Sequence, residues 1–182
     1  MRLPLLLALL IAPTAAAQLH TAPVESVAIH PPLAVPFACS EHPMGAETHV
    51  VDALGTDCTV AERTDEGFPV LHIGDGSRNE DWHIWREPVL APFDGVVRFA
   101  EAHPVVNTPG TWGTGRAGAV LVQQLTRDGR RPISVALVHL REITVAQGDT
   151  VRAGQPVGRV GNNGISRFPH LHVGAFRGDL FS

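Results

Sequence analysis

The chain has 182 residues, 44% hydrophobic and 18% charged, which predicts one folded domain with a short appendage and excludes a disordered chain. Its net charge of −4 excludes a nucleic-acid-binding protein, because such a protein presents a basic face. All 14 basic residues are Arg, and the absence of Lys excludes Schiff-base lysines, P-loop lysines and lipoyl- or biotinyl-lysine carriers. Ten histidines in an acidic chain are the feature that needs an explanation.

The N-terminus has the layout of a secretory signal peptide. Arg2 precedes an apolar run from Leu3 to Ile11, and the small residues that follow predict cleavage after Ala17. The apolar run is too short to cross a bilayer, and no later segment is long enough. We therefore expect residues 1–17 to be removed and the protein to be secreted, to the periplasm or the cell envelope, without a membrane span.

Secretion places the two cysteines of the chain in an oxidising compartment, where disulfides persist. We interpret Cys39 and Cys58 as one disulfide that closes a loop of 20 residues. In the chain-entropy model such a bond contributes about 3 kcal/mol to the free energy of unfolding. A two-cysteine zinc pair is the alternative interpretation, but the spacing fits no zinc-ligand pattern.

The remaining chain divides into an arm and a domain. Residues 18–44 are rich in proline and predict an extended arm, so we expect the folded domain to span residues 45–182. Short β-type runs within it are separated by Gly, Pro and Asp, and helical periodicity is absent. This pattern predicts an all-β fold, an antiparallel sheet or sandwich with long inserted loops.

The predicted strands follow one another at short intervals. Residues 88–100 form a strand, a turn at 94–95 and a second strand, and residues 118–125 and 133–140 form another hairpin. A third set of short strands lies within residues 143–161, and residues 169–176 form the last strand. Residues 103–118 have no periodic pattern and predict a long loop, a kind of segment that often carries function.

The last predicted strand contains His170 and His172 on either side of Leu171. Residues two apart on a strand point to the same face, so both imidazoles point one way and can share metal binding and catalysis. The alternative is two exposed polar residues on a half-buried strand. His139 ends the alternating run of residues 133–139 and shares its apolar face, where a single histidine is more often a core residue than a functional one.

Two segments offer a histidine and an aspartate three positions apart, namely His49 with Asp52 and His72 with Asp75. Zinc accepts both histidine nitrogen and carboxylate oxygen, so either pair can supply two ligands, although such pairs also arise by chance. For His83 the sequence leaves two interpretations open: the side chain lines a substrate groove, or it packs in the interior. We interpret the remaining histidines as solvated surface residues: His20, His30, His42 and His103.

Four ordered segments resemble the LytM/lysostaphin-type zinc metallopeptidases, which cut peptide bonds in bacterial peptidoglycan. They are PVLAPFDGVV (88–97), VHL (138–140), VAQGDTVRAGQPVGRVGNNG (145–164) and SRFPHLHVGA (166–175). The resemblance covers residues 45–177, and PHLH is its most specific part. It implies the LytM peptidase type of all-β fold.

The resemblance also implies a role for each of the strand histidines. His172 corresponds to a zinc ligand, and His139 and His170 correspond to the catalytic histidines. The family's other two ligands are a histidine and an aspartate upstream of the hairpin at 88–97. We expect these to be His49 and Asp52, just before the predicted disulfide. His72 and Asp75 are the alternative pair.

The function implied is a secreted zinc metalloendopeptidase that hydrolyses peptide bonds in peptidoglycan cross-links with a zinc-activated water. Three protein ligands leave the fourth position of Zn²⁺ open, as in catalytic sites. His139 and His170 supply the base and the group that stabilises the oxyanion, in either order. We expect a monomer. The alternative is a catalytically inactive LytM-like module that binds cell wall or regulates other peptidoglycan hydrolases.

Overall fold

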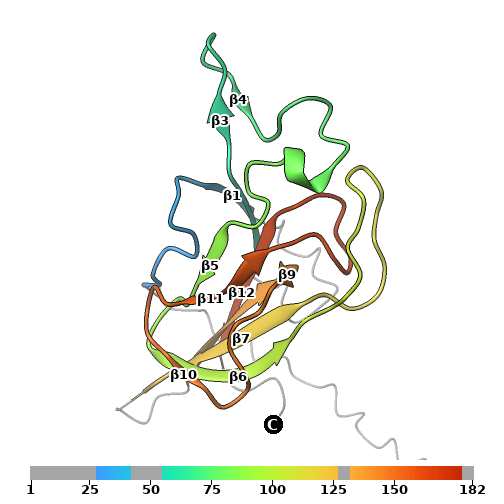
Figure 1. Cartoon of the computed structure of the whole chain (residues 1–182). Helices are drawn as coiled ribbons and strands as arrows, with labels where there is room; N and C mark the ends of the chain where they lie inside the picture. Colours follow the sequence, from blue (N-terminus) through green and yellow to red (C-terminus); the bar gives the residue numbers. More distant parts are fainter. Residues whose placement is uncertain (1–27, 42–54, 127–131, 178–182) are drawn as a thin grey trace, which may run out of the picture.

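The computed structural model describes residues 28–41, 55–126 and 132–177, which form two antiparallel sheets packed against each other (Figure 1). The seven-stranded sheet has the order β1-β2-β12-β8-β7-β6-β10, and the three-stranded sheet has the order β5-β11-β9. In the order of the large sheet, the strands are β1 (Ala38–Glu41), β2 (Thr56–Thr59), β12 (Leu171–Arg177), β8 (Ile133–Val138), β7 (Ala119–Gln124), β6 (Gly95–Glu101) and β10 (Thr150–Val151). The small sheet comprises β5 (Pro88–Leu90), β11 (Pro156–Val160) and β9 (Leu140–Arg141). The all-β prediction is therefore confirmed.

A separate two-stranded hairpin projects from the sheets at the top of Figure 1. It consists of β3 (Glu62–Arg63) and β4 (Pro69–Val70), and it is followed by a single 3₁₀ turn, η1 (Asn79–Asp81). Among the described residues, no helix has the length and apolar character needed to cross a bilayer.

The core lies between the two sheets and is built mainly from β-branched and aliphatic side chains. Val97, Val122 and Val135 of the large sheet belong to the same hydrophobic cluster as Val89 and Val157 of the small sheet, and all five are fully buried. Burial of one such side chain stabilises the fold by roughly 1.5–3 kcal/mol. This shared core holds the strands that carry the candidate site in fixed relative positions.

Strand β12 lies near the middle of the large sheet, with β2 on one side and β8 on the other. Its residue His172 is opposite Asp57 of β2 and opposite Val138 of β8. The register therefore brings the start of β12, the end of β8 and the middle of β2 to the same place.

The predicted hairpin of residues 118–125 and 133–140 is confirmed as the antiparallel pair β7–β8. The predicted hairpin within 88–100 is wrong, because β5 pairs with β11 in the small sheet while β6 pairs with β7 and β10 in the large one. The connecting residues Ala91 and Phe93 are buried, so the chain crosses from one sheet to the other through the core. The segment 143–161 divides between the two sheets in the same way.

The described part of the predicted arm, residues 28–41, packs on the sheets. Leu33 is 2% exposed, belongs to the core cluster and forms an isolated bridge with Val89. Strand β1 forms the edge of the large sheet, and the predicted disulfide joins its Cys39 to the directly opposite Cys58 of β2.

Candidate active site

Three histidines gather at the start of β12. His139 follows β8, His170 precedes β12 and His172 lies within it, and their exposed fractions are 8%, 6% and 4%. The ring centre of His139 lies 4.5 Å from that of His170 and 6.1 Å from that of His172. The structure thus brings together the three histidines that were predicted to act together.

An aspartate on the neighbouring strand completes this cluster. Oδ1 of Asp57 lies 2.9 Å from Nδ1 of His172 and 3.5 Å from Nε2 of His170. Both histidines thus face the same carboxylate oxygen, as expected for residues two apart on a strand. The next residue, Cys58, is opposite Leu171, and both are fully buried in the hydrophobic core.

The backbone of His139 adopts a left-handed conformation with φ of 66°, which is uncommon for a residue other than glycine. Its carbonyl accepts a hydrogen bond from Gly161 N at 3.0 Å, and a Cβ at Gly161 would lie 2.7 Å from that oxygen. Glycine at 161 therefore permits the close approach that holds this conformation. Sparsely populated backbone conformations cluster at functional sites, although Arg86 and Glu142, outside the histidine cluster, also have positive φ.

The proton on the His139 ring is assigned by its hydrogen bond. Nδ1 lies 2.8 Å from the carbonyl oxygen of Asn163, and because a carbonyl only accepts, Nδ1 carries the proton and Nε2 keeps a lone pair. Burial, reinforced by the charges of His170 and His172, lowers the pKa of His139 from 6.5 to about 3. His139 is thus a neutral imidazole whose Nε2 can accept a proton.

His170 is fixed in a similar way. Its Nδ1 donates to the carbonyl oxygen of Phe168 at 2.8 Å, and the hydroxyl oxygen of Ser166 lies 3.4 Å from the same nitrogen. The Phe168 ring contacts His170 at 5.5 Å between centres and stacks on Trp82 at 5.0 Å. Nδ1 therefore carries a proton, and Nε2 lies toward Asp57, 3.5 Å from its Oδ1.

The two predicted histidine–aspartate pairs differ in where they fall. His49 and Asp52 lie outside the described residues. The His72 ring packs on Trp82 at 4.9 Å between centres, so Trp82 and Phe168 lie between His72 and His170 in a row of contacting rings. Asp75 is exposed, and hydrogen bonds from Ser77 lower the pKa of its carboxyl.

The donor atoms around Asp57 suit zinc, which binds histidine nitrogen and carboxylate oxygen in tetrahedral sites. Two such ligand atoms lie about 3.3 Å apart on one ion, close to the separation of Asp57 Oδ1 and His172 Nδ1. In the structure Nδ1 of His172 donates a hydrogen bond to Oδ1 of Asp57, and a bound zinc ion would take the place of this proton. Within residues 28–41, 55–126 and 132–177, no group of three His, Cys, Asp or Glu side chains is arranged to hold a metal ion.

Asp57 is the residue that sequence reasoning missed. The zinc-ligand pattern considered in the sequence places an aspartate three or four positions after a histidine, whereas Asp57 is eight positions after His49. A usable signal was present, since Cys58 was already assigned to a disulfide. A buried half-cystine on a strand implies that Asp57 points to the opposite face of that strand.

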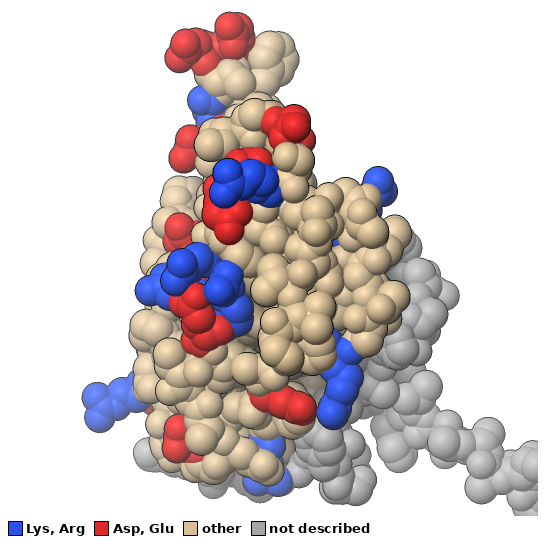
Figure 2. Space-filling model, turned by 45° about the vertical axis from the view of Figure 1, so that its right-hand side comes forward, with Lys and Arg blue, Asp and Glu red and all other residues tan. Residues whose placement is uncertain are grey.

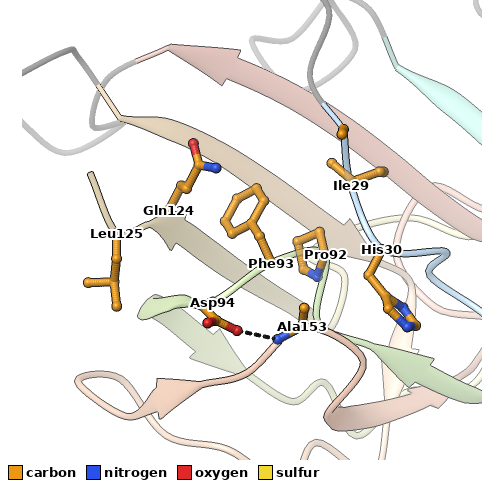
Figure 3. A pocket seen from close by; sticks show the side chains of 9 residues that line it. Ile29, His30, Pro92, Phe93, Asp94, Gln124, Leu125 and Ala153 are labelled. Atoms are coloured by element: carbon orange, nitrogen blue, oxygen red, sulfur yellow. Dashed lines mark hydrogen bonds between the residues drawn. The ribbon is translucent and has the colours of Figure 1, made fainter. Parts of the chain in front are cut away.

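His83, the other candidate, is largely buried, with Nδ1 3.6 Å from a carboxylate oxygen of Glu62. An open pocket of about 510 Å³, drawn in Figure 3, lies at the end of β7 that Gln124 forms. Gln124 lines that pocket, whereas Ala119, at the opposite end of the strand, pairs with Val138. The pocket lining contains none of the candidate site residues.

Comparisons with solved structures give distant likenesses. A mutant of the catalytic domain of the prophage-encoded M23 protein EnpA from Enterococcus faecalis is 19% identical, with a TM-score of 0.49 over 82% of this chain and 88% of that chain. The catalytic domain of lysostaphin from Staphylococcus simulans is 21% identical, with a TM-score of 0.46 over 79% and 83%. A zinc-containing peptidase from Vibrio cholerae is 15% identical, with a TM-score of 0.38 over 68% and 46%.

Among curated proteins, none matches the chain significantly. The model of peptidase family M23 matches residues 83–179, more than half of the chain. The matched stretch contains His139, His170 and His172 and begins after Asp57. The chain therefore belongs to peptidase family M23, and the predicted LytM/lysostaphin-type family is confirmed.

Proposed function

We propose that the protein is an exported zinc metalloendopeptidase that hydrolyses peptide bonds in bacterial peptidoglycan. The observation that carries this proposal is the convergence of His170 and His172 on one oxygen of Asp57, with His139 beside them. Family membership supports the peptidase activity. The Cys39–Cys58 disulfide supports an oxidising compartment, in agreement with the predicted signal peptide.

Asp57 and His172 are the described residues that would hold the zinc ion, and His49 is the third ligand that we propose from the sequence. When bound, zinc supplies Lewis acidity, which polarises a peptide carbonyl and makes water more acidic. His139 offers a neutral Nε2 that accepts a proton from the attacking water, and His170 would donate a hydrogen bond from Nε2 to the reacting carbonyl oxygen. The reverse division of these two tasks fits the same geometry.

The surface beside the site suits a polymeric peptide. Two loops beside the site are hydrogen-bonded to each other, and the second of them leads to His170. Both loops carry exposed apolar side chains: Val105, Val106 and Trp112 on the first, and Ile165 on the second. Figure 2 turns the loop of residues 103–118 toward the viewer and shows a broad uncharged area on the right of the molecule. Such a surface contacts an extended substrate without requiring charge on it.

The test is to measure zinc content and peptide release from purified peptidoglycan, with and without a chelator. We expect about one zinc ion per chain and the release of new amino termini, both abolished by chelation and restored by zinc. Release of sugar fragments, or binding to peptidoglycan without any cleavage by the zinc-loaded protein, contradicts the proposal. The latter result favours the inactive cell-wall-binding or regulatory module.

A further inference from the structure

All four asparagines of the chain form hydrogen bonds in the segments beside His139 and His170. Two of them, Asn162 and Asn163, are only 1% exposed. The side-chain nitrogen of Asn79 donates to the carbonyl of Asn107 at 2.8 Å, and that of Asn162 donates to Oδ1 of Asn79 at 2.8 Å. Segments that are far apart in the chain are therefore joined at this place.

Asn107 connects the loop of residues 103–118 to the segment that leads into β12. Its side-chain nitrogen donates to the carbonyl oxygens of Gly164 and Ser166, each at 3.0 Å, and its backbone N–H donates to the carbonyl of Asn162 at 2.7 Å. Both side-chain N–H groups are thus used on carbonyl acceptors, which fixes the orientation of the amide. An oxygen at the Nδ2 position has no proton to offer these carbonyls.

The same segment positions His170. The hydroxyl oxygen of Ser166 lies 2.8 Å from Oδ1 of Asn162 and 2.9 Å from the carbonyl oxygen of Phe168, and its single proton can go to either acceptor. The same oxygen lies 3.4 Å from Nδ1 of His170, from which it can accept a hydrogen bond. The main acceptor for this nitrogen is the carbonyl of Phe168 at 2.8 Å. Nδ1 therefore keeps its hydrogen bond only while residues 166–168 hold their conformation, and Asn107 is bonded to the first of them.

A neighbouring glycine makes room for this arrangement. A Cβ on Gly113 would lie 2.0–2.4 Å from the side-chain amide atoms of Asn107, so any larger residue displaces that amide. The backbone N–H of Gly113 also donates to the carbonyl of Ser166 at 2.9 Å. Two separate positions on the loop of residues 103–118 thus control the same contact.

We infer that Asn107 is a positioning residue for His170. It holds residues 164–166, and through them the acceptors for Nδ1 of His170, so that the ring directs Nε2 toward the reacting atoms. Gly113 is required for this role because its missing side chain admits the Asn107 amide. The catalytic consequence rests on the proposed function of His170, whereas the effect on the histidine ring does not.

The experiment uses the full exported chain and three variants. Asn107→Asp keeps the shape of the side chain but removes both N–H donors. Gly113→Ala leaves Asn107 in place but displaces its amide. Thr108→Ala is the matched control, because Thr108 is exposed, adjoins Asn107, and its side chain makes none of these hydrogen bonds. The first readout is the Nδ1–H signal of His170 in the ¹⁵N spectrum of the purified protein, assigned by its loss in His170→Ala.

We expect the Nδ1–H signal of His170 to exchange slowly with solvent in the wild type and in Thr108→Ala, and to be broadened or lost in Asn107→Asp and Gly113→Ala. The second readout is peptidase kinetics of the zinc-loaded protein, in which kcat falls roughly tenfold to a hundredfold in these two variants while KM and zinc content are unchanged. A wild-type His170 spectrum in both folded variants overturns the inference. If Asn107→Asp does not fold, Gly113→Ala alone decides. If the two variants alter the His170 Nδ1–H signal in a protein without peptidase activity, the inference is supported and the proposed function is refuted.

Discussion

Asp57 and His172 are 115 positions apart in the chain, yet they face each other across the β2–β12 ladder with Oδ1 2.9 Å from Nδ1. Their contact depends on the register of two strands and on the neighbouring disulfide. The same carboxylate oxygen also faces His170. This relationship makes Asp57 the aspartate whose loss should matter most.

We expect Asp57→Ala to lose most of its zinc and its peptidase activity, because it removes a carboxylate ligand. Asp52→Ala is the matched control, since it removes the aspartate predicted from the sequence. Elemental analysis of both purified variants measures the zinc bound per chain. Full zinc occupancy in Asp57→Ala together with loss of zinc in Asp52→Ala would reverse the assignment.

The third ligand is tested by a second pair of variants. We expect His49→Ala to lose zinc and His72→Ala to retain it, because the His72 ring packs on Trp82, with Phe168 between Trp82 and His170. Zinc content and the zinc dissociation constant are measured for both proteins. The prediction fails if His72→Ala loses zinc while His49→Ala keeps its full complement.

His139→Gln should separate metal binding from catalysis. We expect zinc content to be unchanged and kcat to fall by about 10²–10⁴, the usual contribution of a positioned acid or base. Steady-state kinetics with a peptidoglycan peptide provide the measurement, and zinc content provides the control. A variant that kept wild-type kcat would remove His139 from the mechanism.

The buried His139 also makes a prediction about stability and pH. Its pKa in the folded protein is lowered, mainly by burial, from 6.5 to about 3, so between these values the unfolded chain binds a proton that the folded protein does not. The resulting stability is present above pH 6.5 and is lost as the pH falls, by up to about 1.4 kcal/mol per pH unit.

Urea unfolding of the metal-free protein between pH 7 and pH 5 tests this sign. His139→Gln should show a smaller loss of unfolding free energy with falling pH than the wild type shows, because glutamine does not titrate. Equal slopes for the two proteins would mean that His139 titrates normally in the folded state.

The disulfide offers a separate test of how β2 is held. Reduction, or the double change Cys39→Ser and Cys58→Ser, should lower the free energy of unfolding by about 2–4 kcal/mol. It should also weaken zinc binding, because Cys58 is the neighbour of Asp57 on β2. Thermal unfolding and zinc titration are compared with and without reductant. Unchanged zinc affinity in the reduced, folded protein would show that β12 alone positions Asp57.

The sequence predicted those parts of the site that depend on local pattern. Alternation and turn residues identified β7, β8 and β12, and the His-x-His spacing correctly placed His170 and His172 on one face. Asp57 was not found, because its partner is distant in the chain and the spacing rule considered only nearby histidines. The path of residues 91–94 between the sheets was also missed, since a strand–turn–strand pattern does not specify which sheet each strand joins.

The asparagine contacts were unpredictable for a similar reason. Asn79 and Asn162 bond across 83 positions, and Asn107 and Ser166 across 59. A polar residue in an irregular segment carries no periodic signal, so its partner is known only when the loops are placed in space.

The order of strands in the large sheet also affects the timing of folding. Strand β12, which lies between β2 and β8, is the last described strand to leave the ribosome. A nascent chain that ends before residue 170 has Asp57 and His139 but neither of the histidines that face Asp57. Pairing of strands so distant in sequence is slow, because the closure of a long loop precedes the contacts that stabilise it. Assembly of the site is thus postponed until synthesis of the described chain is complete, and a partly made chain has no competent centre.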